Sequence, residues 1–420
     1  MTSFALPTFH VVLVALLVGT QLLYTALAVR NVNHSADRVA AEHEWLVDEL
    51  SVDEPDRIVD YLRAKTGLSH LQSWLGLGIL LLLLYGGIFT EVVLAIEAIG
   101  LGPIAGGVVF FLLLTGAMQA FSMPFDLVDT FVVEELFDFN TQTARSWVRD
   151  AVLGLGVSTV LTAVVIGAIL GFIVYLPTLW WLAGAGFFLA FTIVMQVLYP
   201  RLIAPLFNDF ERIEDGDLRE AIEGVFERAG FQCEEIYTMD ASRRSTHLNA
   251  YFVGFGRTKR VVLFDTLVDR FGQEEIQSVL AHELAHWKRR HIWKRLGIGT
   301  VRVTLVLFVL WYLLAGGWMT TMFGLPEAAV YAGLLVGLLF VTPVMQLSSP
   351  LVNRVSLAHE READDFAVDV MDDPEPMADA LATLASENLA NPFPDPVYAA
   401  FHYSHPPIPE RIRRLQSERG

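Results

Sequence analysis

Residues 104–123 read IAGGVVFFLLLTGAMQAFSM, twenty residues without a single charge. A helix of about 20 apolar residues spans the roughly 30 Å of hydrocarbon in a bilayer. Similar runs lie at 9–29, 74–95, 151–175, 179–199, 301–317 and 328–348. With 54% hydrophobic and 18% charged residues, the chain is also too apolar for an ordinary soluble protein. We therefore predict a mainly α-helical membrane protein with about seven spans.

The distribution of Lys and Arg predicts how these spans are oriented. If the spans alternate in direction, the connections 1–8, 96–103, 176–178 and 318–327 lie on the side of the N-terminus, and none of them contains Lys or Arg. The positive-inside rule then places the N-terminus outside a cell membrane and the C-terminus in the cytoplasm. The first span lacks the basic flank of a signal peptide, so we expect a retained anchor.

This topology divides the chain into four parts. Residues 1–199 carry spans one to five, and residues 301–348 carry spans six and seven. Residues 200–300 and 349–420 form two cytoplasmic parts. The single cysteine, Cys233, has no internal disulfide partner and is expected in the core of the first cytoplasmic part.

The first cytoplasmic part contains the motif HELAH at residues 282–286. Residues four apart share a helix face, so His282 and His286 can bind one metal ion while Glu283 reaches its water. This spacing is typical of hydrolytic zinc sites. Two histidines on an ordinary amphipathic helix remain the alternative interpretation.

A catalytic zinc ion needs a third protein ligand, and the second cytoplasmic part offers one. The helical stretch LVNRVSLAHEREADDFA, residues 351–367, places Glu360 and Asp364 on one face. We predict Glu360 as the third ligand and Asp364 as the carboxylate that orients a ligand histidine. His359 and Glu362 compete as ligands but point to other faces, and a solvated acidic helix is the alternative.

Short strands are predicted before the HELAH helix, at residues 234–239, 249–255 and 259–265. A free sheet edge beside a metal-bearing helix can bind an extended peptide as an added strand. We expect this edge at residues 250–253, so that Ala250 and Tyr251 would contact substrate. An ordinary buried strand pair is the alternative.

Five segments together resemble the type I CAAX prenyl protease family: HELAHW at 282–287, EREADDFA at 360–367, STHLNAYFVGF with KRVVLFDTL at 245–267, YPRLIAPLFN at 199–208 and YSHPPIPERI at 403–412. The resemblance implies a barrel of seven tilted helices around an intramembrane chamber, capped by a cytoplasmic α+β zinc metallopeptidase domain. It also implies zinc ligation by His282, His286 and Glu360, with Glu283 as the general base. The resemblance also places Asn249 and Ala250 in the substrate-edge strand, and His405 and Arg411 in the motif that contacts substrate and supports the site.

The expected activity is therefore hydrolysis of peptide bonds in membrane-associated or prenylated proteins, with one Zn²⁺ ion per chain. His405, stiffened by two prolines, is a candidate donor to the oxyanion of the reaction, or else a structural cap on the last helix. Rival functions are an HtpX-like quality-control protease and a non-catalytic transport or binding protein. A net charge of −18 argues against nucleic acid as a partner.

Overall fold

The computed structural model describes residues 5–232, 235–253 and 260–417. Cys233 lies outside these residues, as do the first residue of the first predicted strand, the end of the second and the start of the third. Seven helices of the described chain are long and apolar enough to cross a membrane. They are α1 (Ala5–Ala41), α3 (Pro55–Tyr85), α5 (Gly102–Val128), α7 (Ala144–Tyr175), α8 (Trp180–Leu198), α13 (His291–Ala315) and α15 (Val330–Leu347). The predicted number of spans and the mainly helical fold are confirmed.

Several helices are longer than the predicted spans: α1 continues to Ala41 instead of ending at 29, and α7 begins at Ala144 instead of 151. The second span, expected at 74–95, ends at Tyr85, and α4 (Ile88–Ile99) follows as a separate helix. Gly87 between them has a φ of 89°, which a residue with a side chain rarely adopts, and it interrupts the helix. The sixth span begins at His291 rather than at 301, so α13 also contains the basic residues Lys294 and Arg295.

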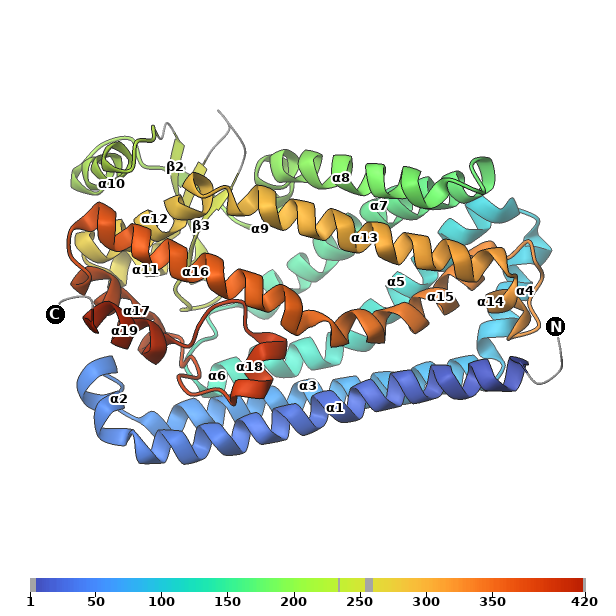
Figure 1. Ribbon diagram of the computed structural model, residues 1–420, viewed down its shortest axis with the longest axis horizontal. Coiled ribbons are helices and arrows are strands. Elements are labelled where there is room, and N and C mark those ends of the chain that lie inside the picture. Colours follow the sequence, from blue (N-terminus) through green and yellow to red (C-terminus); the bar gives the residue numbers. More distant parts are fainter. Residues whose placement is uncertain (1–4, 233–234, 254–259, 418–420) are drawn as a thin grey trace.

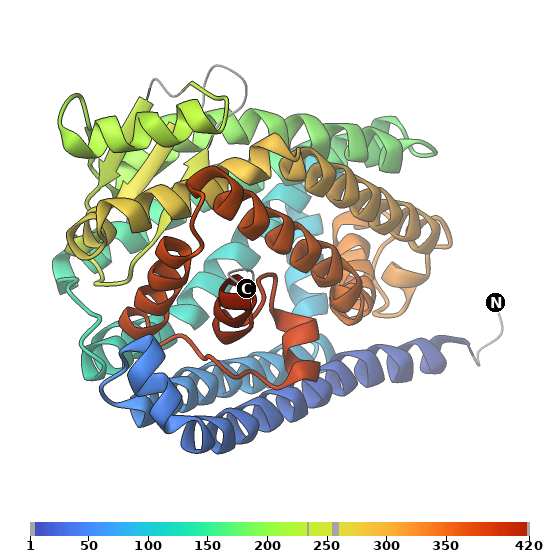
Figure 2. The same cartoon turned by 60° about the vertical axis from the view of Figure 1, so that its left-hand side comes forward.

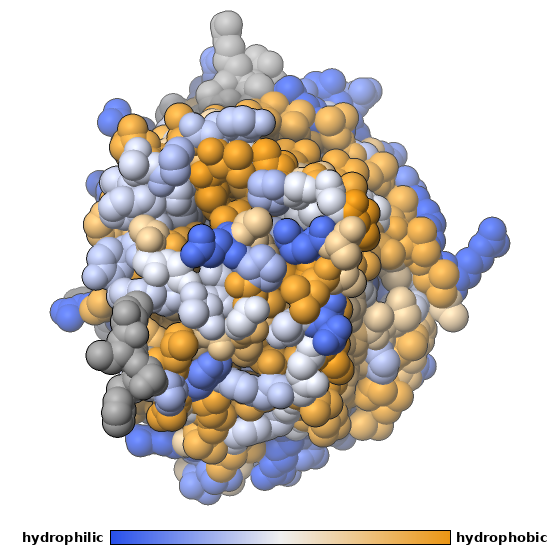
Figure 3. All heavy atoms as spheres, turned by 90° about the vertical axis from the view of Figure 1, so that its right-hand side faces the viewer, coloured by the Kyte–Doolittle hydropathy of each residue, from blue (hydrophilic) through white to orange (hydrophobic). Residues whose placement is uncertain are grey.

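The long helices run along the longest axis of the molecule (Figure 1). The strands of the sheet and most of the short helices lie together at one end of these long helices. At the opposite end lie α4 and α14 (Trp318–Thr321), near the N-terminus (Figure 1). The surface at that end mixes large hydrophobic areas with scattered hydrophilic groups (Figure 3). On the side of the bundle, α7 exposes Val152 and Val160 by more than 60%, as expected of a helix that faces lipid.

Short elements extend two of the spans toward the sheet. After α5, the chain continues through the π-helical turn η1 (Asp129–Val133) into α6 (Glu134–Leu136). After α8, it continues through η2 (Tyr199–Ile203) into α9 (Ala204–Phe207). The helix α2 (His43–Leu50) connects α1 to α3 at the same end.

The sheet has four strands in the order β1-β2-β4-β3, namely β1 (Phe210–Arg212), β2 (Glu235–Met239), β4 (Arg260–Phe264) and β3 (Ala250–Val253). The strands β2 and β4 are parallel, and the other pairs are antiparallel. The sequence analysis did not predict β1, which has only three residues. β3 is an edge strand, with a strand neighbour on one side only among the described residues.

One face of the sheet packs against α10 (Asp217–Arg228) and α12 (Gln273–Lys288). The core between them includes Ile222, Phe226, Ile236, Leu263 and Leu280, all nearly or fully buried. The helix α16 (Ser349–Met371) packs along α12, and its Ala363 and Phe366 join the same core. The described chain also contains η3 (Ala241–Arg243), α11 (Asp265–Arg270), α17 (Glu375–Glu387), α18 (Pro396–His402) and α19 (Ile408–Ser417).

The N-terminal helix is bound to the C-terminal part of the chain. Its residues Arg30 and Asn31 contact Asp395, and Ser35 donates a hydrogen bond to the carbonyl of Phe393. In the oblique view of Figure 2, α19, in dark red beside the C-terminus, is surrounded by other helices. A cavity of about 630 Å³ lies among α1, α3, α15 and α18, with both apolar and polar lining residues.

Candidate metal centre

The HELAH motif lies in the second half of α12. The side chain of Glu275 accepts a hydrogen bond of 2.6 Å from the backbone of Gly272 and thereby caps the start of the helix. His282, Glu283 and His286 follow two and three turns later on one face. Their candidate ligand atoms lie within 4.8 Å of one another, so one metal ion can reach all of them.

Glu360 reaches this group from α16. Its side chain is fully buried, with one carboxylate oxygen 3.3 Å from Nε2 of His282 and the other 3.5 Å from Nε2 of His286. Two imidazole nitrogens and a carboxylate thus face one point, while Glu283 stands beside them. Two His and one Glu are a known ligand set for catalytic zinc, so these residues fit the ion that the motif implies.

Asp364 lies one turn beyond Glu360 on α16, and it fixes the orientation of His282. Its Oδ1 is 2.9 Å from Nδ1 of His282, so the imidazole presents Nε2 to the metal position. Arg411 of α19 donates two hydrogen bonds of 2.6 and 3.0 Å to the same carboxylate. Because this guanidinium is buried against Asp364, Arg411 supports the ligand face, and its contact with substrate stays a prediction.

A second chain of contacts orients His286, and the sequence analysis missed it. Nδ1 of His286 lies 3.0 Å from Nδ1 of His291, whose Nε2 lies 3.0 Å from the carboxylate of Glu362. The ring of His359 stacks on His291 at 4.0 Å. His291 is fully buried beside a candidate ligand.

No helical spacing in the sequence points to His291, which comes five residues after His286. Five residues along one continuous helix would turn His291 away from the metal. However, Arg290 adopts a left-handed conformation with a φ of 59° between α12 and α13. This turn returns the chain toward the site, so the contact depends on the conformation of a single residue.

His405 lies before α19 and contacts Glu360. Its Nδ1 is 2.6 Å from Oε2 of Glu360, and more than half of its side chain is exposed. Arg295 donates a hydrogen bond of 3.0 Å to the other oxygen of this carboxylate. The exposed ring of His405 is therefore open to a molecule that approaches the metal position.

The buried groups of the site have strongly shifted pKa values. Burial lowers the pKa of His282, but hydrogen bonds to Asp364 and Glu360 outweigh it and raise the value to about 9. Burial and the charge of His282 lower the pKa of His286 to about 3. Burial raises the pKa of Glu283 above its ordinary value, which favours proton uptake by this carboxylate.

The predicted substrate strand has its expected place at the sheet edge. Ala250 and Phe252 pack on the core that β3 shares with α12. Tyr251 points to the opposite face, where it packs with Met239 and Val262. Successive side chains of a strand alternate between faces, so Ala250 and Tyr251 lie on opposite faces of the sheet edge, and their contact with substrate stays a prediction.

Comparisons with known proteins agree with this architecture. Residues 28–209 match the family model described as "CAAX prenyl protease N-terminal, five membrane helices", and residues 212–419 match Peptidase family M48. The CAAX prenyl protease 1 homolog of Arabidopsis thaliana is 38% identical over 314 residues, which are 71% of each chain. The CAAX prenyl protease 1 of Saccharomyces cerevisiae is 29% identical and matches 88% of this chain and 87% of its own.

A solved structure extends the match to nearly the whole chain. The crystal structure of S. mikatae Ste24p superposes with a TM-score of 0.86 at 25% sequence identity, covering 97% of this chain and 98% of that one. The match supports the expected ring of seven helices around an intramembrane chamber. Both family models, the relatives and the site geometry lead to one conclusion: this chain is a membrane-spanning metalloendopeptidase that belongs to the type I CAAX prenyl protease family.

Proposed function

We propose that the metal is zinc, that His282, His286 and Glu360 hold it, and that Glu283 is the general base. The convergence of both Nε2 atoms on the buried carboxylate of Glu360 carries this proposal. Bound there, zinc would supply a Lewis acid that acidifies water and polarises a carbonyl group. Asp364 and His291 hold the two histidines so that Nε2 of each faces the ion.

The protein residues then move the proton and bind the peptide. Glu283 accepts a proton from the attacking water and passes it to the leaving amine, a role that its raised pKa supports. His405 is open to the approaching substrate and can donate a hydrogen bond to the developing oxyanion. The backbone of Asn249, Ala250 and Tyr251 offers the edge to which an extended peptide can add.

The Glu283→Gln variant tests this assignment, because an amide cannot accept the proton while the three ligands stay intact. We expect peptide hydrolysis to be abolished and zinc to remain bound at one ion per chain. Purified wild-type and variant proteins would be compared by metal analysis and by mass spectrometry of peptide products. Retained hydrolysis in the variant would remove Glu283 as the base.

We propose that the substrates are membrane-associated peptides that include prenylated CAAX-type sequences. The names of the relatives support this substrate class, and seven spans distinguish the chain from the HtpX-like alternative. Matched peptides with and without a prenyl group, analysed by mass spectrometry, test it. Equal cleavage of both peptides would show that the prenyl group is not recognised.

We also propose that the catalytic end faces the cytoplasm of a cell and that the N-terminus lies outside. The sheet and the metal centre lie at one end of the helix bundle, and the N-terminus lies at the other (Figure 1). The basic residues of the connections belong to the end with the sheet, as the positive-inside rule requires for a cytoplasmic face.

A further inference from the structure

The segment from Arg244 to Leu248 leads directly into Asn249 and β3. On its way it pairs with the residues after α6: Thr246 donates a backbone hydrogen bond of 3.1 Å to Phe139, and Thr141 donates one of 3.2 Å to Arg244. The segment therefore packs against the ends of the membrane helices before it enters the sheet. Two polar side chains, Arg244 and His247, hold it there.

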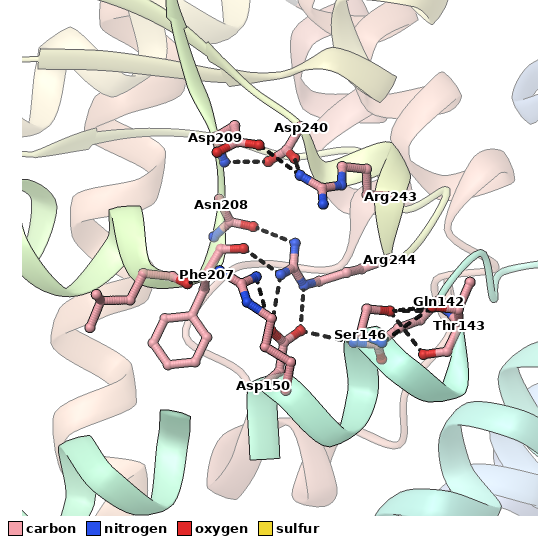
Figure 4. Close-up of polar contacts among 12 residues, drawn as sticks. Gln142, Thr143, Ser146, Asp150, Phe207, Asn208, Asp209, Asp240, Arg243 and Arg244 are labelled. Atoms are coloured by element: carbon pink, nitrogen blue, oxygen red, sulfur yellow. Dashed lines mark hydrogen bonds and ion pairs between the residues drawn. The ribbon is translucent and has the colours of Figure 1, made fainter. Parts of the chain in front are cut away.

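Arg244 connects three parts of the chain (Figure 4). Its guanidinium donates hydrogen bonds of 2.8 and 3.2 Å to the carboxylate of Asp150 on α7 and one of 3.1 Å to Asn208. It also donates to the backbone carbonyl of Phe207, the last residue of α9. Both partners of the ion pair are about four-fifths buried, so solvent screens this pair less than a surface pair.

The neighbouring Arg243 provides an internal contrast. It pairs with Asp209 and Asp240 at 2.7 Å each, but more than half of its side chain and most of Asp209 are exposed. Figure 4 shows the two arginines directed to separate groups of partners. Exposed pairs of this kind contribute little to a local structure, so Arg243 is a matched control for Arg244.

His247 forms the second connection. Its Nε2 lies 3.2 Å from the carboxylate of Glu134 on α6, and its Nδ1 lies 3.2 Å from the side-chain oxygen of Asn388. Its ring stacks on Phe139 with 4.2 Å between the ring centroids. Glu134 is held in turn by Lys65 and Tyr61 of α3, at 2.9 and 2.8 Å.

Asn388 links this connection to the residue before the predicted substrate edge. Its side chain accepts a hydrogen bond of 2.9 Å from the backbone N–H of Leu248 and donates one of 3.3 Å to the carbonyl of the same residue. The amide thus binds Leu248 as a neighbouring strand would. Leu248 itself is buried in the core that contains α12. A displacement of His247 or Asn388 would therefore shift Asn249 and Ala250 relative to the metal centre.

We propose that Arg244 and His247 are positioning residues for peptide binding. They fix the start of β3 to the ends of α7, α9 and α6, and so set the register of the sheet edge relative to α12. This inference rests on the proposed function, because it requires a peptide to add to β3. Neither residue touches the candidate metal ligands, so their substitution should alter the binding of the peptide and leave zinc in place.

The test compares Arg244→Ala and His247→Ala with Arg243→Ala in the full-length protein. We expect the first two to raise KM for a peptide substrate about tenfold or more, because small displacements at a site are costly. Their zinc content should equal that of the wild type, and Arg243→Ala should keep the wild-type KM. Arg244→Lys and His247→Gln, which each keep one hydrogen-bonding nitrogen, should restore part of the loss.

A second measurement separates positioning from a general loss of structure. Methylation of single peptide nitrogens removes a hydrogen bond to an added strand, so it should weaken binding to the wild type. In Arg244→Ala and His247→Ala, N-methylation should weaken peptide binding by a smaller factor, because the pairing of the peptide with β3 is already impaired. The inference would be overturned if N-methylation weakened binding by the same factor in the variants as in the wild type, or if KM were unchanged in both variants.

The proposed function fails separately if the wild-type protein cleaves no peptide. Peptide binding to Glu283→Gln, measured by fluorescence anisotropy with and without the two substitutions, would then decide the inference by itself. Binding that is weaker in both combined variants supports positioning, and binding that is equal in all of them overturns it.

Discussion

Asp364→Asn should weaken zinc binding although Asp364 does not itself face the metal position. The carboxylate is fully buried, where it accepts from Arg411 and lies 2.9 Å from His282. Asparagine keeps the shape of the side chain but removes the charge that orients the imidazole and makes it a better ligand. Loss of such a partner typically lowers metal affinity 10- to 100-fold, or about 1.4 to 2.7 kcal/mol.

The same substitution should also destabilise the fold, since it leaves the guanidinium of Arg411 buried without its counter-charge. Breaking a buried pair in this way costs about 3 to 5 kcal/mol. Replacing Arg411 by Met in the same protein should recover part of the stability, because both charges are then gone. Zinc affinity should not recover, because His282 still lacks its carboxylate.

The assay is competition for zinc with a chelator of known affinity, together with thermal unfolding in detergent. Asp365→Asn is the matched control: Asp365 is the next residue on α16, it is about half exposed, and it pairs with Arg414 at 2.9 Å. An exposed pair of this kind contributes at most about 1 kcal/mol. If Asp364→Asn bound zinc as tightly as this control, the proposed orientation of His282 by Asp364 would be refuted.

Three further predictions follow from the site and the topology. Glu360→Ala should abolish both zinc binding and hydrolysis, since only two protein ligands remain; metal analysis showing one zinc ion per chain would place the third ligand elsewhere. Zinc affinity should rise roughly tenfold per pH unit between about pH 5 and 9, because the metal displaces one proton from His282, whose pKa is raised to about 9, and a pH-independent affinity would contradict this. In a Cys233→Ser background, an impermeant thiol reagent added to intact cells should label a cysteine at the exposed position Ala328 but not one at the exposed position Ser417, and the reverse result would invert the proposed orientation.

Local patterns predicted much of this protein because their physical causes are local. A run such as 104–123 has to be a helix in a bilayer, where every backbone polar group needs an internal partner. The spacing of His282 and His286 is a property of one helical turn, so it holds wherever that helix lies. The same helical spacing placed Glu360 and Asp364 on one face of a second helix, and the need of catalytic zinc for a third ligand connected that face with HELAH.

Local patterns were insufficient where the conformation of one residue or the choice of a face decided the outcome. Gly87 ends a helix inside an apolar run that hydropathy reads as continuous. Arg290, at a φ of 59°, turns His291 back toward His286, although the sequence places the two histidines on different helical faces. Tyr251 lies on the sheet face away from α12. Alternation along a strand divides its side chains between two faces, but the pairing register decides which of these faces meets α12.

The sequence by itself therefore determined the membrane-spanning class, the family and the candidate ligands, since these depend on composition, spacing and motif identity. Only the tertiary structure decided the contacts by which other residues hold those ligands and the sheet edge. The contacts of Arg411 with Asp364, of His291 with Glu362 and of His247 with Glu134 join residues 47, 71 and 113 positions apart. Such pairs form because helices from separate parts of the chain pack side by side, and helical or strand periodicity carries no information about partners at that separation.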